Sequence, residues 1–197
     1  MKRLVIVLVA VVVVAAAGLA VTRSLRPHLY AGTVLQSPQP APEFTLPAHT
    51  GAEVSPADHR GDIVLLYFGY THCPDVCPLT LSSVAKALDQ IGDDAERVHL
   101  MMITVDPERD TLEVLGDYMG HFDESFLGLS GDPDEIARIA ALYGVFYRAG
   151  EGDESTGYVV DHTATLMAID PTGALRVVYS PEIGADALAP DLKELLG

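Results

Sequence analysis

The chain has 197 residues, of which 49% are hydrophobic and 20% are charged, and this is enough for one globular domain with its own core. Its 28 acidic residues outnumber its 12 basic residues, and the formal net charge is −16. All of the acidic residues but only eight of the basic ones lie in residues 30–197. Because a strongly acidic domain repels polyanions, this charge argues against nucleic acid as a partner.

The N-terminal segment differs from the rest of the chain. Residues 1–3 include two basic side chains, and residues 4–21 are 18 residues without a charge. A helix of that length spans roughly 27 Å, close to the ~30 Å hydrocarbon core of a bilayer. We therefore predict a transmembrane signal-anchor over residues 1–22, which holds the domain at the periplasmic or extracytoplasmic face of a membrane. The alternative is a cleaved signal peptide.

Residues 23–42 are rich in proline and small polar residues, and they predict a linker between this segment and a folded domain over residues 43–197. The domain begins with a short predicted strand at residues 44–46. The continuous apolar run at residues 63–68 predicts a central strand that is covered on both faces. The helical spacing of apolar residues that follows predicts a helix from Pro78 to Gly92.

The second half of the domain alternates in the same way. Strands are predicted at residues 98–105 and 126–129, each followed by a helix start signal, at Asp110–Glu113 and at Asp132–Glu135. A hairpin over residues 164–179 and a helix over residues 186–196 close the chain. This order predicts an α/β fold with one mixed sheet flanked by helices on both faces. Ligands in such folds gather beyond the carboxyl ends of the strands.

The only two cysteines, Cys73 and Cys77, lie directly after the predicted central strand. In a helical turn this spacing places the two Cβ atoms about 5–6 Å apart, within reach of a disulfide. A helix N-terminus favours the thiolate, which is the form that binds metal or attacks a disulfide. The spacing alone leaves three roles open: a structural disulfide, a soft-metal site and thiol–disulfide exchange.

Two thiolates rarely complete a metal site, so a histidine ligand is needed. Six of the seven histidines lie in the linker, in early loops, beside Cys73, inside a strand or at a helix end. His162 directly precedes the strand at residues 164–169, and at that junction it could approach the cysteine loop across the sheet end. Position alone leaves a merely hydrogen-bonded histidine as an alternative. Asp161 could orient His162, or it could be a solvated carboxylate.

Three separated motifs resemble the signature of the Sco/SenC family, and they occur in the family's order between about Phe44 and the C-terminus. They are residues 67–78 (YFGYTHCPDVCP), residues 104–111 (TVDPERDT) and residues 161–163 (DHT). The resemblance implies a thioredoxin-like fold outside the membrane and one copper ion per chain, as Cu(I) or Cu(II), bound by Cys73, Cys77 and His162. It also implies a metallochaperone that helps assemble the dinuclear copper centre of cytochrome c oxidase. The implied partner is the copper-accepting subunit of that oxidase or another copper protein.

A thiol–disulfide oxidoreductase that acts on the cysteines of a copper-protein partner is the alternative, with Cys73 and Cys77 forming a disulfide when oxidised. Thioredoxin relatives, however, use a CxxC spacing and a cis-proline where this chain has His162 and Thr163. A peroxiredoxin-like peroxidase would need Thr-x-x-Cys, which is absent. Asp75 is expected either to tune the site or to cap the helix.

Two further expectations concern residues near the site. Asp106 and Pro107 are expected to shape a loop beside the site. Met101 and Met102 could be soft ligands, but the alternation of side chains in a strand places at least one of them in the core.

Overall fold

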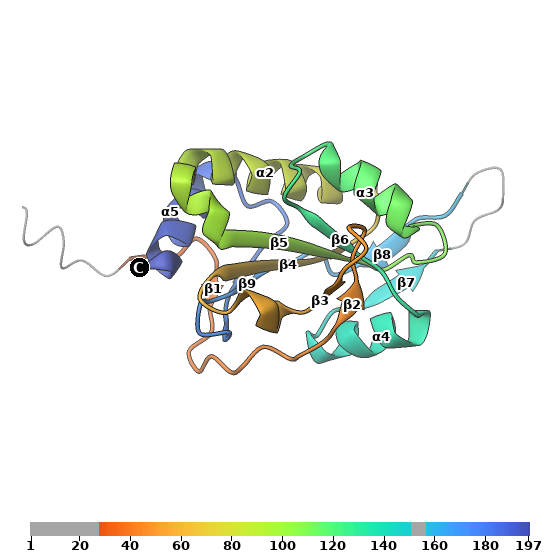
Figure 1. The fold of residues 1–197 in the computed structure, drawn as a ribbon, viewed down its shortest axis with the longest axis horizontal. Coiled ribbons are helices and arrows are strands. Elements are labelled where there is room, and N and C mark those ends of the chain that lie inside the picture. The colour runs from red at the N-terminus through yellow and green to blue at the C-terminus, as the bar shows by residue number, and fades with distance from the viewer. Residues whose placement is uncertain (1–27, 151–156) are drawn as a thin grey trace, which may run out of the picture.

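The computed structural model describes residues 28–150 and 157–197 (Figure 1). The apolar run at residues 4–21, for which we predict a membrane anchor, lies outside the described residues. Among the residues that are described, no helix combines the length and the apolar character needed to cross a membrane.

The core of the domain is a six-stranded mixed sheet with the strand order β1-β10-β9-β4-β5-β6. The central strand β4 runs parallel to β5 and antiparallel to β9, and all seven of its residues are buried. The strand bounds are β1 (Thr33–Val34), β4 (Ile63–Gly69), β5 (Val98–Thr104), β6 (Leu127–Leu129), β9 (Leu166–Ile169) and β10 (Leu175–Tyr179). Two small hairpins complete the strands, β2 (Leu46–Pro47) with β3 (Glu53–Val54), and β7 (Tyr147–Ala149) with β8 (Val160–His162).

Helices cover both faces of this sheet (Figure 1). Tyr67 and Phe68 are neighbours in β4 and therefore point to opposite faces. The Tyr67 hydroxyl reaches Cys77 on one side, and the Phe68 ring packs against Tyr143, directly after α4, on the other. The helices are α2 (Val76–Ile91), α3 (Leu112–Gly120), α4 (Pro133–Leu142) and α5 (Ala185–Leu196), with short 3-10 turns η1 (Pro56–His59) and η2 (Gly92–Arg97). The predicted mixed α/β sheet flanked by helices is confirmed.

Helix α2 begins two residues earlier than predicted, at Val76 rather than at Pro78. Proline is tolerated as the third residue because the first N–H groups of a helix have no partner within it. The first backbone bond that closes a turn runs from Leu79 N to Asp75 O, at 3.3 Å. Cys77 consequently lies inside the first turn of α2, whereas Cys73 lies in the loop before it.

Part of the predicted linker belongs to the sheet. Strand β1 pairs with β10, the Ala41 amide donates to the Gly173 carbonyl at 2.9 Å, and the Leu175 amide donates to the Gln39 carbonyl at 3.1 Å. Prolines confine such a segment to a sheet edge. A two-residue strand at an edge also lacks the alternation of apolar residues that would have indicated it in the sequence.

A histidine pair at the amino end of the central strands generates a pH prediction. The rings of His59 and His99 lie 4.0 Å apart between centroids. Burial and the neighbouring His99 lower the pKa of His59, and the carboxylates of Asp58 and Asp62 oppose this shift only in part. The unfolded chain therefore takes up a proton at His59 more readily than the folded one does.

We expect the free energy of unfolding to decrease as the pH falls through about 6.5, the value for an unperturbed histidine. Urea unfolding at pH 7.5 and pH 5.5 measures this loss. The loss should be smaller in His59→Gln, and unchanged in His121→Gln, which alters an exposed histidine at the end of α3. An equal loss in the parent and in His59→Gln would contradict the assignment.

Candidate metal centre

The two cysteines and His162 meet at the carboxyl end of β4. The cysteine loop leaves β4 through Gly69, and His162 is the last residue of β8. The two Sγ atoms and a ring nitrogen of His162 all lie within 4.8 Å of one another, and Nε2 is 3.5 Å from the Cys77 Sγ. Both cysteines are free. The structure thus brings together the three predicted ligands, although their role as copper ligands stays a prediction.

The two thiols differ in their environment. Cys73 is 8% exposed, whereas Cys77 is fully buried. The hydrogen bond from the Cys77 thiol, together with backbone N–H groups of Asp75 and Cys77, lowers the pKa of Cys73 to about 5 in spite of its burial. The same hydrogen bond and deeper burial raise the pKa of Cys77. Near neutral pH the pair therefore holds one proton, with the thiolate at Cys73.

The backbone of β8 fixes the orientation of the His162 ring. Nδ1 lies 3.1 Å from the Val160 carbonyl oxygen, which only accepts, so Nδ1 carries the proton. The lone pair of the neutral ring is then at Nε2, the nitrogen that faces Cys77. The Tyr70 ring packs edge-on against the imidazole at 5.4 Å between centroids. Val160 and Tyr70 thus hold the ring with Nε2 toward the two sulfur atoms.

Neither carboxylate that we expected near the ligands contacts the imidazole. Asp161 is exposed and its carboxylate lies 3.7 Å from the Arg148 guanidinium, because successive residues of a strand point to opposite faces. The Val160 carbonyl makes the orienting contact that was one of the two expectations for Asp161, and the exposed Asp161 matches the other, a solvated carboxylate. Asp75 is exposed at the N-cap of α2, and its side chain makes no capping hydrogen bond, so the capping alternative is wrong. An influence of its carboxylate on the site stays a prediction.

Two residues of β4 shape the site although the sequence indicated only a buried strand. The Tyr67 hydroxyl donates to the Cys77 Sγ at 3.4 Å. Gly69 allows the strand to approach that sulfur, since a Cβ atom there would lie 3.0 Å from the Cys77 Sγ and 2.7 Å from the Tyr67 ring. The glycine inside an otherwise apolar run was the available signal, because glycine in a strand often marks a close approach.

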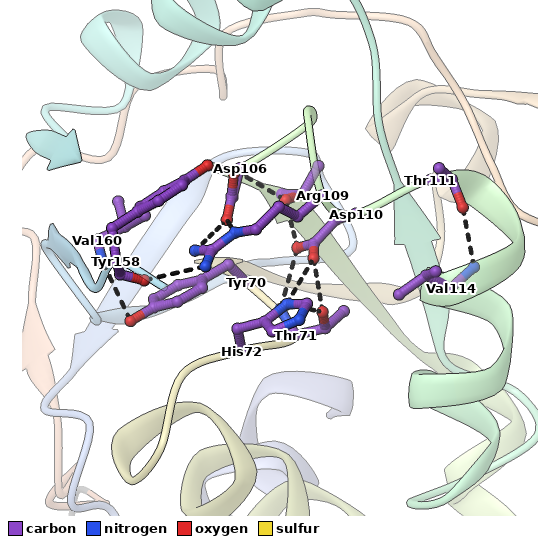
Figure 2. A network of polar contacts seen from close by, with 11 residues as sticks. Tyr70, Thr71, His72, Asp106, Arg109, Asp110, Thr111, Val114, Tyr158 and Val160 are labelled. Atoms are coloured by element: carbon purple, nitrogen blue, oxygen red, sulfur yellow. Dashed lines mark hydrogen bonds and ion pairs between the residues drawn. The ribbon is translucent and has the colours of Figure 1, made fainter. Parts of the chain in front are cut away.

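Polar residues of the loop that follows β5 form a network with residues 70–72 and with Tyr158 and Val160 (Figure 2). None of the three predicted ligands is among the residues labelled in it. Asp110 does not cap α3; Thr111 does, by accepting from the Val114 amide at 3.2 Å. The Asp106 carboxylate is bonded to Arg109 and Tyr158, in agreement with the expected loop-shaping role. Met101 and Met102 are both fully buried, so both of them, and not only one, belong to the core.

Comparison with known proteins identifies the family. A family model described as SCO1/SenC matches residues 33–197. The chain belongs to the SCO1/SenC family. The mitochondrial SCO2 homolog of Bos taurus is 38% identical over 153 residues, which are 77% of this chain and 58% of that protein. The mitochondrial SCO1 homolog of Homo sapiens is 39% identical over 132 residues, 66% of this chain and 44% of that protein. The chain spans about half the length of these curated relatives.

Two solved structures of SCO1/SenC relatives have the same fold as this chain. Apo Sco1 from Thermus thermophilus superposes with a TM-score of 0.77 at 39% identity, covering 85% of this chain and 98% of that one. ScoI from Bradyrhizobium japonicum, solved with copper bound, gives a TM-score of 0.73 at 36% identity and covers 80% of this chain and 99% of that one. These similarities confirm the predicted family and the predicted sheet.

The unequal thiols predict unequal reactivity. Because the Cys73 pKa is about 5, the alkylation rate of Cys73 with iodoacetamide should reach half its maximum near pH 5, while Cys77 reacts far more slowly. Mass spectrometry of digested samples assigns the modified residue. In Cys77→Ala, Cys73 loses the donor that stabilises its thiolate, so the midpoint should move toward the ordinary value of about 8.5. The same midpoint in both proteins would contradict this account.

Proposed function

We propose that this chain binds one copper ion through Sγ of Cys73, Sγ of Cys77 and Nε2 of His162. The observation that carries the proposal is the convergence of these three atoms within 4.8 Å. Thiolate sulfur selects Cu(I), and an added imidazole also suits Cu(II), so the donor set fits copper in both oxidation states. The copper-bound relative from Bradyrhizobium japonicum supports the choice of metal.

The protonation states of the site favour metal uptake. Cys73 is already a thiolate near neutral pH, and in a neutral His162 ring the Val160 contact places the proton on Nδ1 and leaves Nε2 for the ion. Of the two cysteines, only Cys77 has to release a proton when an ion binds, and metal ligation drives such a release. Copper uptake should therefore release one proton rather than two from the cysteine pair.

We infer further that the chain is a metallochaperone, which delivers copper in the assembly of the dinuclear copper centre of cytochrome c oxidase. The recipient would be the copper-accepting subunit of that oxidase or another copper protein. The position of the site supports transfer, because His162 is only partly buried and the loop residues Pro74 and Asp75 are exposed. Copper can then pass to ligands of a partner that approaches this loop.

The proposal includes a place in the cell. Residues 1–22 would act as a signal-anchor that holds the copper-binding domain at the extracytoplasmic face of a membrane, with a cleaved signal peptide as the alternative. The support is the run of 18 uncharged residues. Membrane fractionation and N-terminal sequencing of the mature protein distinguish the two.

Copper titration tests the ligand set. The full-length chain, reduced and in detergent, should bind one equivalent of Cu(I) or Cu(II) in competition with a chelator of known affinity. Cys73→Ser, Cys77→Ser and His162→Ala should each weaken binding by more than the roughly 10–100-fold that is typical of losing a residue that only orients a ligand. His121→Ala, which alters an exposed histidine at the end of α3, is the control and should bind as the parent does. Binding that is indifferent to His162 would overturn the three-ligand site.

The unequal thiols also favour a second candidate function, the reduction of a disulfide in a copper-protein partner. The Cys73 thiolate would attack one sulfur of that disulfide, form a mixed disulfide and release one partner thiolate. Cys77 would then lose its proton and attack the Cys73 sulfur, which releases the second partner thiolate and leaves a Cys73–Cys77 disulfide. The chain loses two electrons and the partner gains them.

The reduction potential of the cysteine pair tests this second function. Equilibration of the metal-free chain with thiol–disulfide buffers should give a potential above about −300 mV if the pair exchanges with partners. Cys77→Ser should accumulate the mixed disulfide, because the second attack is lost. A potential far below −300 mV would mark a structural disulfide and would exclude redox cycling.

A further inference from the structure

Two carboxylates are buried beside the cysteine loop, and neither belongs to the proposed ligand set. Asp106 is 4% exposed and Asp110 is fully buried, and both follow β5 within the loop of residues 105–111. Burial of a carboxylate is costly unless hydrogen bonds or an opposite charge compensate for it. The partners of these two side chains therefore reveal what the loop holds in place.

Asp110 holds the cysteine loop. Its Oδ1 accepts from the Thr71 hydroxyl at 2.6 Å, and its Oδ2 accepts from the Thr71 amide at 3.0 Å and from the Thr104 hydroxyl at 2.7 Å. Thr71 is two residues before Cys73, and its hydroxyl also lies 3.0 Å from Nδ1 of His72. One carboxylate thus ties the start of the cysteine loop to the end of β5.

Arg109 and Asp106 hold the other half of the site. Arg109 donates through Nε to Asp106, and its Nη1 donates to the Tyr158 carbonyl at 3.0 Å. The Tyr158 hydroxyl donates to Asp106 at 2.7 Å, and the guanidinium lies 3.6 Å from the centroid of the Tyr158 ring. Tyr158 is four residues before His162, so these contacts fix the chain that leads into β8.

The two halves also meet at Tyr70. The Tyr70 hydroxyl accepts from the Val160 amide at 3.2 Å, and its ring packs against His162. The Arg109 guanidinium lies 5.9 Å from the Tyr70 centroid. Figure 2 shows Arg109 between Asp106 and the two tyrosine rings, with Asp110 and Thr71 beside them.

We propose that Arg109 is a positioning residue, which sets the place of His162 relative to Cys73 and Cys77 and thereby the copper affinity of the site. Arg109 contacts none of the three ligands; it acts through Tyr158 and the backbone that continues to Val160 and His162. The planar Arg109 guanidinium donates to the Asp106 carboxylate and to the Tyr158 carbonyl at the same time, a geometry that a lysine ammonium cannot reproduce. The inference rests on the proposed copper site.

The test uses Cu(II) titration of the full-length chain, with the thiolate-to-copper absorption band as a second readout. Arg109→Lys keeps the positive charge beside Asp106 but loses the guanidinium that bonds Asp106 and the Tyr158 carbonyl together. Tyr158→Phe removes only the hydroxyl that donates to Asp106. Each should weaken Cu(II) binding by roughly 10–100-fold and shift the absorption band in the direction seen in His162→Ala. Arg138→Lys is the matched control, since Arg138 also pairs with an acid three residues earlier, Glu135, but on the exposed surface of α4.

A double-mutant cycle separates positioning from general destabilisation. If Arg109 acts through His162, Arg109→Lys combined with His162→Ala should bind Cu(II) no more weakly than His162→Ala alone. Parent affinity and spectrum in both Arg109→Lys and Tyr158→Phe, or additive losses in the cycle, would overturn the inference. Failure of the copper site itself would appear differently, as parent binding that does not depend on His162.

Discussion

The antiparallel pairing of β9 with β4 is the constraint on which the site depends. Tyr67 lies opposite Leu166 in this pair. The chain that leaves β4 and the chain that enters β9 therefore lie side by side, at the carboxyl end of β4. The first of these segments carries the cysteine loop and the second carries β8 with His162. Because β4 is buried on both faces, a shift in the register between β4 and β9 would expose core residues. The relative position of the two segments is fixed with that register.

Strand pairing alone does not fix the segments beyond their last ladder bond, whereas a set of metal ligands has to be held within about 0.5 Å of its geometry. The polar loop after β5 supplies this control. It buries two carboxylates, and each accepts from a different half of the site, Asp110 from Thr71 and Asp106 from Tyr158, while Arg109 of the same loop also donates to Asp106. Since an unpaired buried carboxylate is costly, the network resists displacement of either half.

The same surroundings make the two sulfur atoms unequal. Cys73 lies in the loop before α2 and receives backbone N–H groups, while Cys77 lies in the first turn, beneath Gly69 and beside the Tyr67 hydroxyl. A pair that holds one proton suits both proposed functions, because a single thiolate is ready to bind an ion or to attack a disulfide. What distinguishes the two functions is therefore whether the partner takes copper from the thiolates or is reduced by them.

The sequence by itself determined the local features: the buried strand after residue 62, the helix that ends at Gly92, the cap and proline that open α4, and a soft-ligand pair four residues apart. Each depends on neighbours in the chain, through periodicity, capping and glycine conformation. Position in the chain also singled out His162, and the family motifs implied that it is the third ligand. Tertiary structure decided the rest. It placed part of the predicted linker in the sheet. The Asp110 carboxylate accepts from Thr71 and does not cap α3. The His162 ring is oriented by the Val160 carbonyl and not by Asp161. The first two outcomes depend on contacts between residues 39 to 145 positions apart, whose partners no local pattern specifies. The third joins residues only two positions apart, but it requires the extended backbone that β8 adopts by pairing with β7.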